Sequence, residues 1–153
     1  MIALNCRAAV NVTRVSLPFM GQGSRILEIC SSSAFQPLPG FNLYAATKAF
    51  LLHYTRALRW EVSGRGIRVT AVCPGWIKTN FMDIARDTDN PKAVGRCTQL
   101  AQRPEQVAAW ALKMNAAGLA VATCSPPALV QRFGAKILPN CITMAAWELL
   151  RRI

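Results

Sequence analysis

The feature that most constrains the fold is a pair of short apolar segments that flank one long amphipathic segment. Residues 25–30 and 67–73 are rich in Ile, Leu, Val and Cys, and residues 25–30 lack the alternation of a strand with one exposed face. Between them, residues 43–62 carry Leu51 and Leu58 at helical spacing. A strand, a helix and a second strand in this order predict a right-handed βαβ unit with parallel strands.

Polar residues occur where the first of these strands ends and where the helix begins. Ser31 follows the strand, and Tyr44 and Lys48 are four residues apart, which places them on one face of the helix. Open parallel sheets bind ligands beyond the carboxyl ends of their strands, so we expect the three side chains to converge there. A neighbouring ammonium favours the phenolate, so Lys48 is predicted to lower the Tyr44 pKa from its ordinary value of about 10.

In four places the sequence resembles the short-chain dehydrogenases/reductases. Ser31 lies thirteen positions before Tyr44, and YAATK at 44–48 fits the family's YxxxK motif. Asn5 matches an asparagine of the first helix, and PGWIKT at 74–79 matches PGxxxT. YxxxK alone occurs by chance in many helices, but serine, tyrosine and lysine at this spacing, after a strand and before PGxxxT, are specific together. The resemblance covers almost the whole chain.

The resemblance implies an oxidoreductase that uses NAD or NADP to interconvert a carbonyl and an alcohol. It assigns catalytic roles to Asn5, Ser31, Tyr44 and Lys48. Ser31 would hold the substrate oxygen, and Tyr44 would donate or accept the proton. Lys48 would lower the Tyr44 pKa and hold the nicotinamide ribose hydroxyls, and Asn5 would hold a water in the proton relay.

The resemblance also implies which residues contact the nicotinamide half of the cofactor. These are Tyr44, Lys48, Pro74, Gly75, Ile77 and Thr79. Pro74 and Gly75 allow the backbone to turn close to a flat ligand, and Ile77 and Thr79 would contact the carboxamide. Without the upstream serine, tyrosine and lysine, this segment would be interpreted as an ordinary turn after a strand.

Several features of the family have no counterpart in these 153 residues. The TGxxxGxG phosphate loop, the residue that selects NAD or NADP, and the NNAG run are absent. We therefore expect a partial Rossmann-like, doubly wound parallel α/β sheet, without the first βαβαβ half, in a truncated or late-started chain. About three strands should remain, one with an unpaired edge. An alternative is a non-catalytic remnant that cannot bind the dinucleotide.

The expected organisation is a single partial domain over residues 1–153. Residues 1–79 would form the catalytic core with the nicotinamide-side motifs. Residues 80–103 would form a flap over the substrate, and residues 104–153 the C-terminal helices and the last strand, at 119–123.

Two further segments have helical patterns. Residues 2–20 predict a helix with Arg7 and Arg14 opposite its apolar face, and Pro104 followed by Glu105 marks another helix start. The apolar face of the first is Ile2, Cys6, Val10, Val12 and Leu17, and the expected buried stripe of the second is Val107, Trp110, Ala111 and Met114.

The net charge of +11 permits a basic module that binds nucleic acid or a membrane surface. The basic residues are mostly single, with one adjacent pair at 151–152, and no stacking aromatics are interleaved with them. We therefore expect no nucleic-acid partner, and the basic module is the third hypothesis. No apolar run is long enough to span a bilayer and no signal peptide is visible, so a cytoplasmic protein without a membrane span is predicted.

The remaining predictions concern thiols, metals and partners. Six cysteines without a CxxC pair indicate buried, reduced thiols, and His53, the only histidine, has no partner at ligand spacing, so no metal site is expected. By resemblance, a homo-oligomer would form through the helix at 43–62. The segments 34–42 and 80–100 are apolar enough for a hydrophobic ketone, steroid or acyl chain as the small-molecule substrate.

Overall fold

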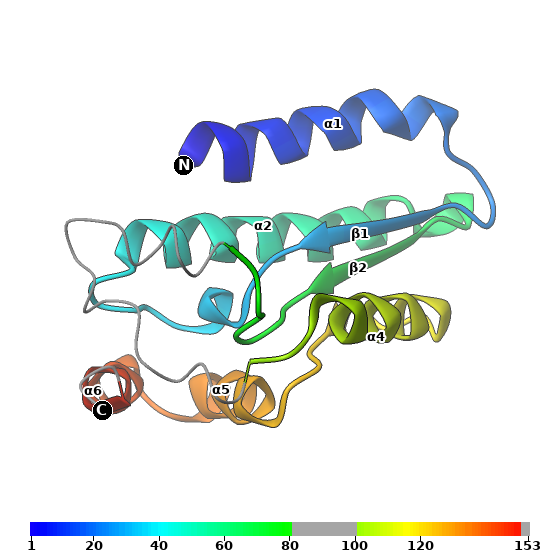
Figure 1. Cartoon of the computed structure of the whole chain (residues 1–153). Coiled ribbons are helices and arrows are strands. Elements are labelled where there is room, and N and C mark those ends of the chain that lie inside the picture. The colour runs from blue at the N-terminus through cyan, green and yellow to red at the C-terminus, as the bar shows by residue number, and fades with distance from the viewer. Residues whose placement is uncertain (81–100, 151–153) are drawn as a thin grey trace.

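Three parallel strands in the order β1-β2-β3 form the sheet at the centre of the fold (Figure 1). The strands are β1 (Arg25–Ile29), β2 (Arg68–Val72) and the short β3 (Val121–Ala122). This computed structural model describes residues 1–80 and 101–150. The predicted parallel pairing is confirmed, and each strand is shorter than its sequence pattern suggested.

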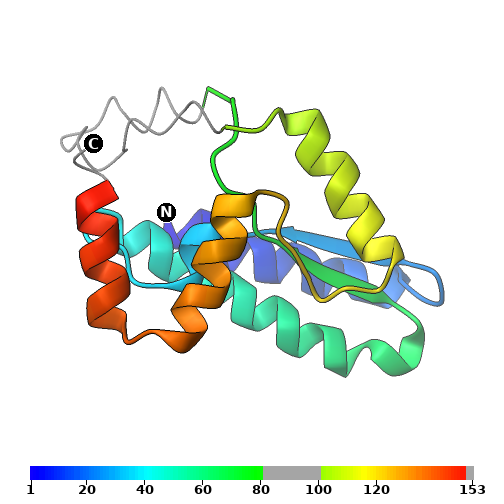
Figure 2. The same ribbon diagram turned by 90° about the horizontal axis from the view of Figure 1, so that it is seen from below.

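Helices cover both faces of the sheet, as in a doubly wound fold (Figure 2). On one face lie α1 (Ala9–Ser16) and α2 (Asn42–Glu61), and on the other lies α4 (Pro104–Ala116). After β3 the chain continues through α5 (Pro126–Ile137) and α6 (Asn140–Leu150). The expected partial Rossmann-like α/β architecture is confirmed.

The first helical segment changes its winding along its length. A π-helix spans Ala3–Ala8, α1 follows, and a 3-10 turn at Leu17–Phe19 contains Pro18, as predicted for the last turn. The π-helix contains Asn5, and nothing in the apolar periodicity indicated it. Such wide turns are often found at functional sites in helices.

The central strand is buried, whereas β1 is an edge strand. Val69 and Ala71 of β2 are fully buried, but Ile29 at the end of β1 is 58% exposed. Ile26 packs against the buried residues of α2 and Leu27 against those of α4, so β1 is covered on both faces as expected, and the exposure of Ile29 belongs to the end of the strand. Among the described residues β1 pairs with β2 alone, so its outer edge is open, as a sheet of three strands required.

The buried stripe of α2 follows the prediction, and that of α4 does so only in part. Leu51 and Leu58 are buried. Val107 and Ala111 of α4 are also buried, but Trp110 is 39% exposed. Val107 and Ala111 are four residues apart and lie in one row along the helix. Trp110 lies beside this row, so part of its side chain is exposed to solvent.

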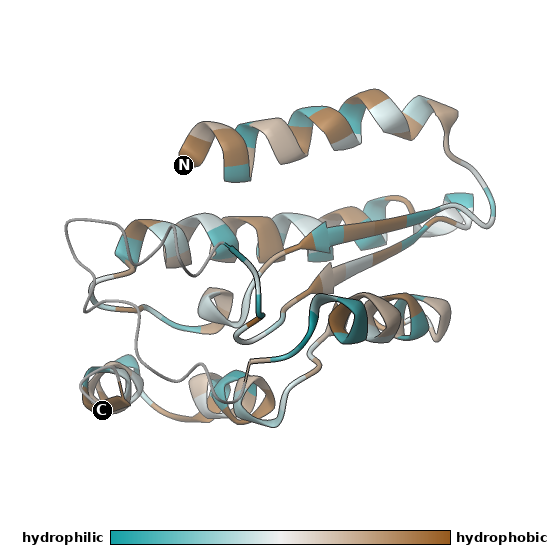
Figure 3. Cartoon of the chain, in the orientation of Figure 1, coloured by the Kyte–Doolittle hydropathy of each residue, from teal (hydrophilic) through white to brown (hydrophobic). Residues whose placement is uncertain are grey.

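Much of the apolar surface of the first helical segment is uncovered. Figure 3 shows hydrophobic residues along the whole of α1 and the turn before it. The large exposed apolar residues of this segment are Met1, Ile2, Leu4, Val12, Val15 and Phe19. Ile2 and Val12 were assigned to the apolar face of an amphipathic helix, and both are exposed. Within the described part of the chain, no helix combines the length and hydrophobicity needed to cross a membrane.

The cysteines of the described residues are all free thiols. Cys30 and Cys73, which follow β1 and β2, are buried as predicted, whereas Cys141 is exposed. Cys97 lies outside the described residues. The interpretation of these side chains as small buried hydrophobes therefore holds for Cys30 and Cys73, which follow the carboxyl ends of β1 and β2.

Candidate functional site

Three of the four residues expected to be catalytic lie together at the carboxyl ends of β1 and β2. Ser31 and Tyr44 are hydrogen-bonded through their side chains. The Lys48 Nζ atom lies 5.8 Å from the centroid of the Tyr44 ring, one helical turn further along α2. The structure thus brings a hydroxyl, a phenol and an ammonium to one rim of the sheet, where open α/β folds bind their ligands.

The loop after β1 fixes the direction of the Ser31 hydroxyl. The backbone N–H of Ser33 donates to Ser31 Oγ at 3.2 Å, which uses an acceptor position of that oxygen and leaves its proton available for Tyr44. The N–H of Ser32 donates to the carbonyl of Pro74 at 2.8 Å and so ties this loop to the one after β2. Of the three serines, it is Ser31 that meets the phenol, as the spacing indicated.

The protonation of Tyr44 differs from the sequence-based expectation. Burial raises the pKa of the Tyr44 phenol above its ordinary value, and the hydrogen bond with Ser31 only partly offsets this. Burial also lowers the pKa of Lys48. The prediction that Lys48 brings the Tyr44 pKa below its usual value was therefore wrong for this structure, because burial penalises the charged phenolate more than the Ser31 hydrogen bond stabilises it.

Lys48 is held by the open edge of the sheet. Its Nζ donates to the carbonyl oxygen of Ile29 at 2.8 Å. The backbone groups of Ser24 and Cys30 bond to β2, so the alternate residue Ile29 presents its carbonyl on the outer side of β1. The Lys48 ammonium therefore gives the Ile29 carbonyl a hydrogen bond that no described strand supplies. The same ammonium lies close to the Tyr44 ring.

Asn5 joins the site through a residue that the sequence analysis did not single out. Its Nδ2 donates to Thr47 Oγ1 at 3.1 Å, and the Thr47 hydroxyl donates to the carbonyl of Tyr44 at 2.8 Å. Thr47 is buried and precedes Lys48. Asn5 is thereby fixed beside the turn of α2 that carries Tyr44 and Lys48. No motif marks this contact, which joins residues 42 positions apart.

Gly75 is required by the packing of the chain itself. A Cβ at Gly75 would lie 2.7 Å from Ser125 Oγ, which no ordinary contact allows. Ser125 is the N-cap of α5, where its Oγ accepts from the N–H of Ala128. The lack of a side chain at Gly75 therefore makes room for the start of α5. That the Gly75 backbone also passes close to a nicotinamide stays a prediction.

The segment after Gly75 is held by a parallel bridge between Ile77 and Gln102. Lys78 N–H donates to the Gln102 carbonyl, and Gln102 N–H to the Trp76 carbonyl, both at 2.9 Å. This pattern leaves the N–H and C=O of Ile77 on the opposite side of the segment. Thr79 is exposed at its end. Most of the expected flap at 80–103 lies outside the described residues.

These groups fit the nicotinamide half of a dinucleotide. The Tyr44 hydroxyl and the Lys48 ammonium can bind ribose hydroxyls, and the backbone of Ile77 offers a donor and an acceptor to an amide. The 153 residues contain no glycine-rich loop of the kind that binds a pyrophosphate.

A hollow of about 510 Å³ lies beside the first turns of α2. Apolar side chains from the loop after β1, from α2 and from α6 line it, among them Phe35, Leu38 and Met144. Trp147 Nε1 donates to the carbonyl of Pro39 at 3.0 Å, which holds α6 against the loop. The hollow therefore borders the same turns of α2 that carry Tyr44 and Lys48, although neither side chain lines it.

The chain matches one family model and is similar to characterised proteins. Residues 1–90 match the model for short chain dehydrogenases. Over 84 residues the chain is 40% identical to sulfoacetaldehyde reductase 2 of Chromohalobacter salexigens. The aligned region covers 53% of this chain and 33% of that protein. The match thus spans about a third of the length of that relative.

Solved structures resemble the chain over nearly its whole length. A short chain dehydrogenase from Burkholderia cenocepacia, in complex with NADP, has a TM-score of 0.73 at 21% identity, covering 96% of this chain and 57% of its own. A short-chain dehydrogenase from Sphingobium yanoikuyae, in complex with NADPH, has a TM-score of 0.62 at 25% identity, covering 99% and 55%. The first likeness is one of fold alone.

Proposed function

The chain belongs to the short-chain dehydrogenase family, and from that membership we propose an oxidoreductase that interconverts a carbonyl and an alcohol with NAD(P)(H). The observation that carries the proposal is the hydrogen bond between Ser31 and Tyr44, with Lys48 one turn away. We assign catalytic roles to these three residues and to Asn5.

The proposed mechanism divides the work between the cofactor and the side chains. Reduced nicotinamide, when bound, supplies the hydride. Ser31 holds the substrate oxygen, and Tyr44 gives that oxygen its proton; in the oxidation direction Tyr44 takes the proton back. The ordinary pKa of a tyrosine is about 10 and burial raises that of Tyr44 further, so the phenol carries the proton that a carbonyl reduction requires. Asn5 would hold a water that returns the proton from solvent.

The proposed cofactor is NAD or NADP, held on its nicotinamide side. The residues assigned to it are Tyr44, Lys48, Pro74, Gly75, Ile77 and Thr79. The NADPH complex of the Sphingobium yanoikuyae relative supports a nicotinamide cofactor without deciding between the two for this chain. Lys48 would exchange the Ile29 carbonyl for the ribose hydroxyls.

We propose a small carbonyl compound with an apolar part as the substrate. The support is the apolar hollow beside α2, lined by Phe35, Leu38 and Met144. The sulfoacetaldehyde reductase relative supports an aldehyde or ketone as the reacting group.

A homo-oligomer through α2 completes the proposal on partners. Phe50 and Trp60 of α2 are 47% and 82% exposed, and Leu43 at its start is 48% exposed. Uncovered aromatic and aliphatic side chains along one helix are typical of an interface. Free thiols in the described residues favour a reducing compartment, which supports a cytoplasmic location.

The second candidate is a non-catalytic chain that does not bind a dinucleotide by itself. Two observations favour it: the 153 residues contain no phosphate loop, and the Lys48 ammonium is already bonded to the Ile29 carbonyl. Such a chain would at most associate with a longer relative.

Binding and turnover by the purified 153-residue chain separate the two candidates. NADPH is titrated first, followed by NADH. Consumption of reduced nicotinamide is then measured with sulfoacetaldehyde, a 3-oxoacyl thioester and a cyclic ketone. Saturable binding with carbonyl-dependent oxidation is the result expected for the oxidoreductase. Failure of both cofactors to bind would overturn it in favour of the second candidate.

A further inference from the structure

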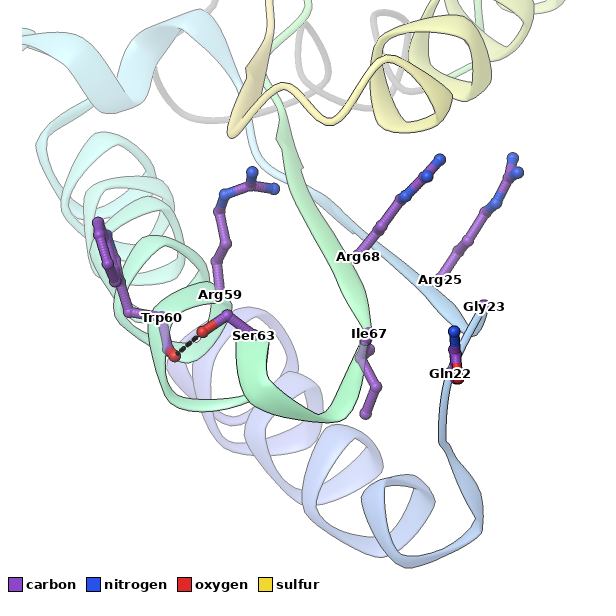
Figure 4. Close-up of a pocket in the computed structure, with 9 residues that line it drawn as sticks. Gln22, Gly23, Arg25, Arg59, Trp60, Ser63, Ile67 and Arg68 are labelled. Atoms are coloured by element: carbon purple, nitrogen blue, oxygen red, sulfur yellow. Dashed lines mark hydrogen bonds between the residues drawn. The ribbon is translucent and has the colours of Figure 1, made fainter.

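A second hollow lies at the end of the sheet opposite Tyr44. It has a volume of about 600 Å³ and is formed where β1 and β2 begin and where α2 ends (Figure 4). None of the described residues that line it is acidic, whereas three of them are arginines. This charge is not used by the proposed mechanism, which acts at the carboxyl ends of the strands.

The three arginines come from three elements and line the same hollow. Arg25 and Arg68 are register partners at the starts of β1 and β2, and their side chains extend to the same side of the sheet in Figure 4. Arg59 reaches toward that side from α2. Like charges that line one hollow repel one another, so an anion bound among them would relieve an unfavourable interaction.

Two of the guanidinium groups are held in place by backbone carbonyls. Arg59 donates to Val69 at 3.0 Å and to Gly118 at 2.7 Å, and Arg68 donates to Ala116 at 2.7 Å. A guanidinium has five N–H donors, so these bonds leave donors on both side chains for a ligand. Neutral carbonyls fix the groups without cancelling their charge. The donors are therefore oriented before a ligand arrives.

Backbone hydrogen bonds connect the two loops that precede Arg25 and Arg68. Gly23 N–H donates to the Gly66 carbonyl at 3.1 Å, and Arg68 N–H donates to the Ser24 carbonyl at 2.9 Å, which joins the two loops that precede the strands. Gly66 has a φ of +68°, and a Cβ there would lie 3.1–3.3 Å from atoms of Gln22. The loops thus form a fixed support for Arg25 and Arg68.

We propose that this hollow binds a small molecule through a phosphate group. Planar guanidinium donors match the oxygens of a phosphate, and bonds between the two charged groups are among the strongest hydrogen bonds in proteins. The Trp60 ring also lines the hollow, on the far side of Arg59 from Arg25 and Arg68 (Figure 4). The group that the three arginines recognise is therefore the phosphate itself.

The test is a titration of the isotope-labelled 153-residue chain with pyrophosphate, followed by NMR at physiological ionic strength. We expect saturable shifts at the backbone amides of Gly23, Arg25 and Gly66, and at the guanidinium Nε of Arg68. Glycerol phosphate, titrated in parallel, distinguishes a phosphate ester from free phosphate as the source. Shifts spread over the basic surface, or shifts that do not saturate, would overturn the proposal.

Two variants of equal charge separate a built site from general attraction to a basic chain. Arg25→Ala is expected to weaken pyrophosphate binding about tenfold, the effect of losing a charge-assisted hydrogen bond. Arg56→Ala removes the same charge from an exposed position of α2 outside the hollow and should change the affinity little. Equal weakening by the two variants would contradict the proposal. Because the hollow is remote from Tyr44, neither outcome depends on the proposed oxidoreductase activity.

Discussion

Tyr44→Phe is expected to lower carbonyl turnover by about 10²–10⁴-fold, the usual contribution of a general acid, while NADPH binding stays within about threefold. The substitution removes the phenol hydroxyl that bonds to Ser31 and keeps the ring. The edge-to-face contact with Phe41, at 5.8 Å between centroids, can therefore persist, as can the position of the ring near Lys48. The loss would be chemical and not a failure to fold.

Tyr54→Phe is the matched control for this experiment. Tyr54 is the other tyrosine of the chain, and its ring stacks on Phe50 with 6.4 Å between the ring centroids. Steady-state rates and NADPH titrations are measured for the wild type and both variants. If Tyr44→Phe turned over as fast as Tyr54→Phe, the role assigned to Tyr44 would be wrong.

Asn115→Ala is expected to lower the free energy of unfolding by about 2–3 kcal/mol. Asn115 of α4 is fully buried, and its Nδ2 donates to Thr70 Oγ1 at 3.1 Å and to the Arg68 carbonyl at 3.3 Å. The substitution would leave these acceptors of β2 buried and less well bonded. The substitution also removes Asn115 Oδ1, a buried acceptor without a hydrogen-bond partner in the described structure, and this partly offsets the loss of stability.

Urea unfolding compares this variant with Asn11→Ala. Asn11 is exposed on α1, so its replacement should change the free energy of unfolding by no more than about 0.5 kcal/mol. The midpoint should fall for Asn115→Ala without a change in slope. Equal midpoints for the two variants would mean that the contact between α4 and β2 contributes little.

The elements were predictable from the sequence because each has a local cause. Apolar runs gave β1 and β2, helical spacing gave α2, and Pro104 with Glu105 marked the start of α4, which begins at Pro104 as expected. Ser31, Tyr44 and Lys48 were also placed together correctly, since the end of a strand and one face of a helix determine where they lie.

The sequence did not predict the contacts that hold these elements against one another. Asn115 bonds to β2 across 45 positions, and Asn5 bonds to Thr47 across 42. Arg59 reaches Gly118 across 59 positions. Such contacts depend on how the elements pack, and neither periodicity nor a motif records them. For this reason the arginine-lined hollow appears in the structure alone.

The pKa of Tyr44 shows the same limit. The sequence places an ammonium one turn away, and that neighbour alone favours a lower pKa. The depth at which the phenol is buried depends on the loop after β1 and on α2 together, and this burial reverses the direction of the shift. The charge of a neighbour was readable from the motif, and the desolvation was not.

The central claim, that the Ser31 hydroxyl acts directly on the Tyr44 phenol, is tested most directly by a tyrosinate titration. In a Tyr54→Phe background Tyr44 is the remaining phenol, and its ultraviolet absorbance is followed with pH while circular dichroism monitors folding. Ionisation is expected above the ordinary tyrosine value of about 10, because burial raises the pKa.

Adding Ser31→Ala should raise the midpoint further, because the hydrogen bond with Ser31 lowers the Tyr44 pKa. Ser32→Ala, at the adjacent position, is the control and should leave the midpoint unchanged. A midpoint that does not move, or that falls, when Ser31 is replaced would contradict the account.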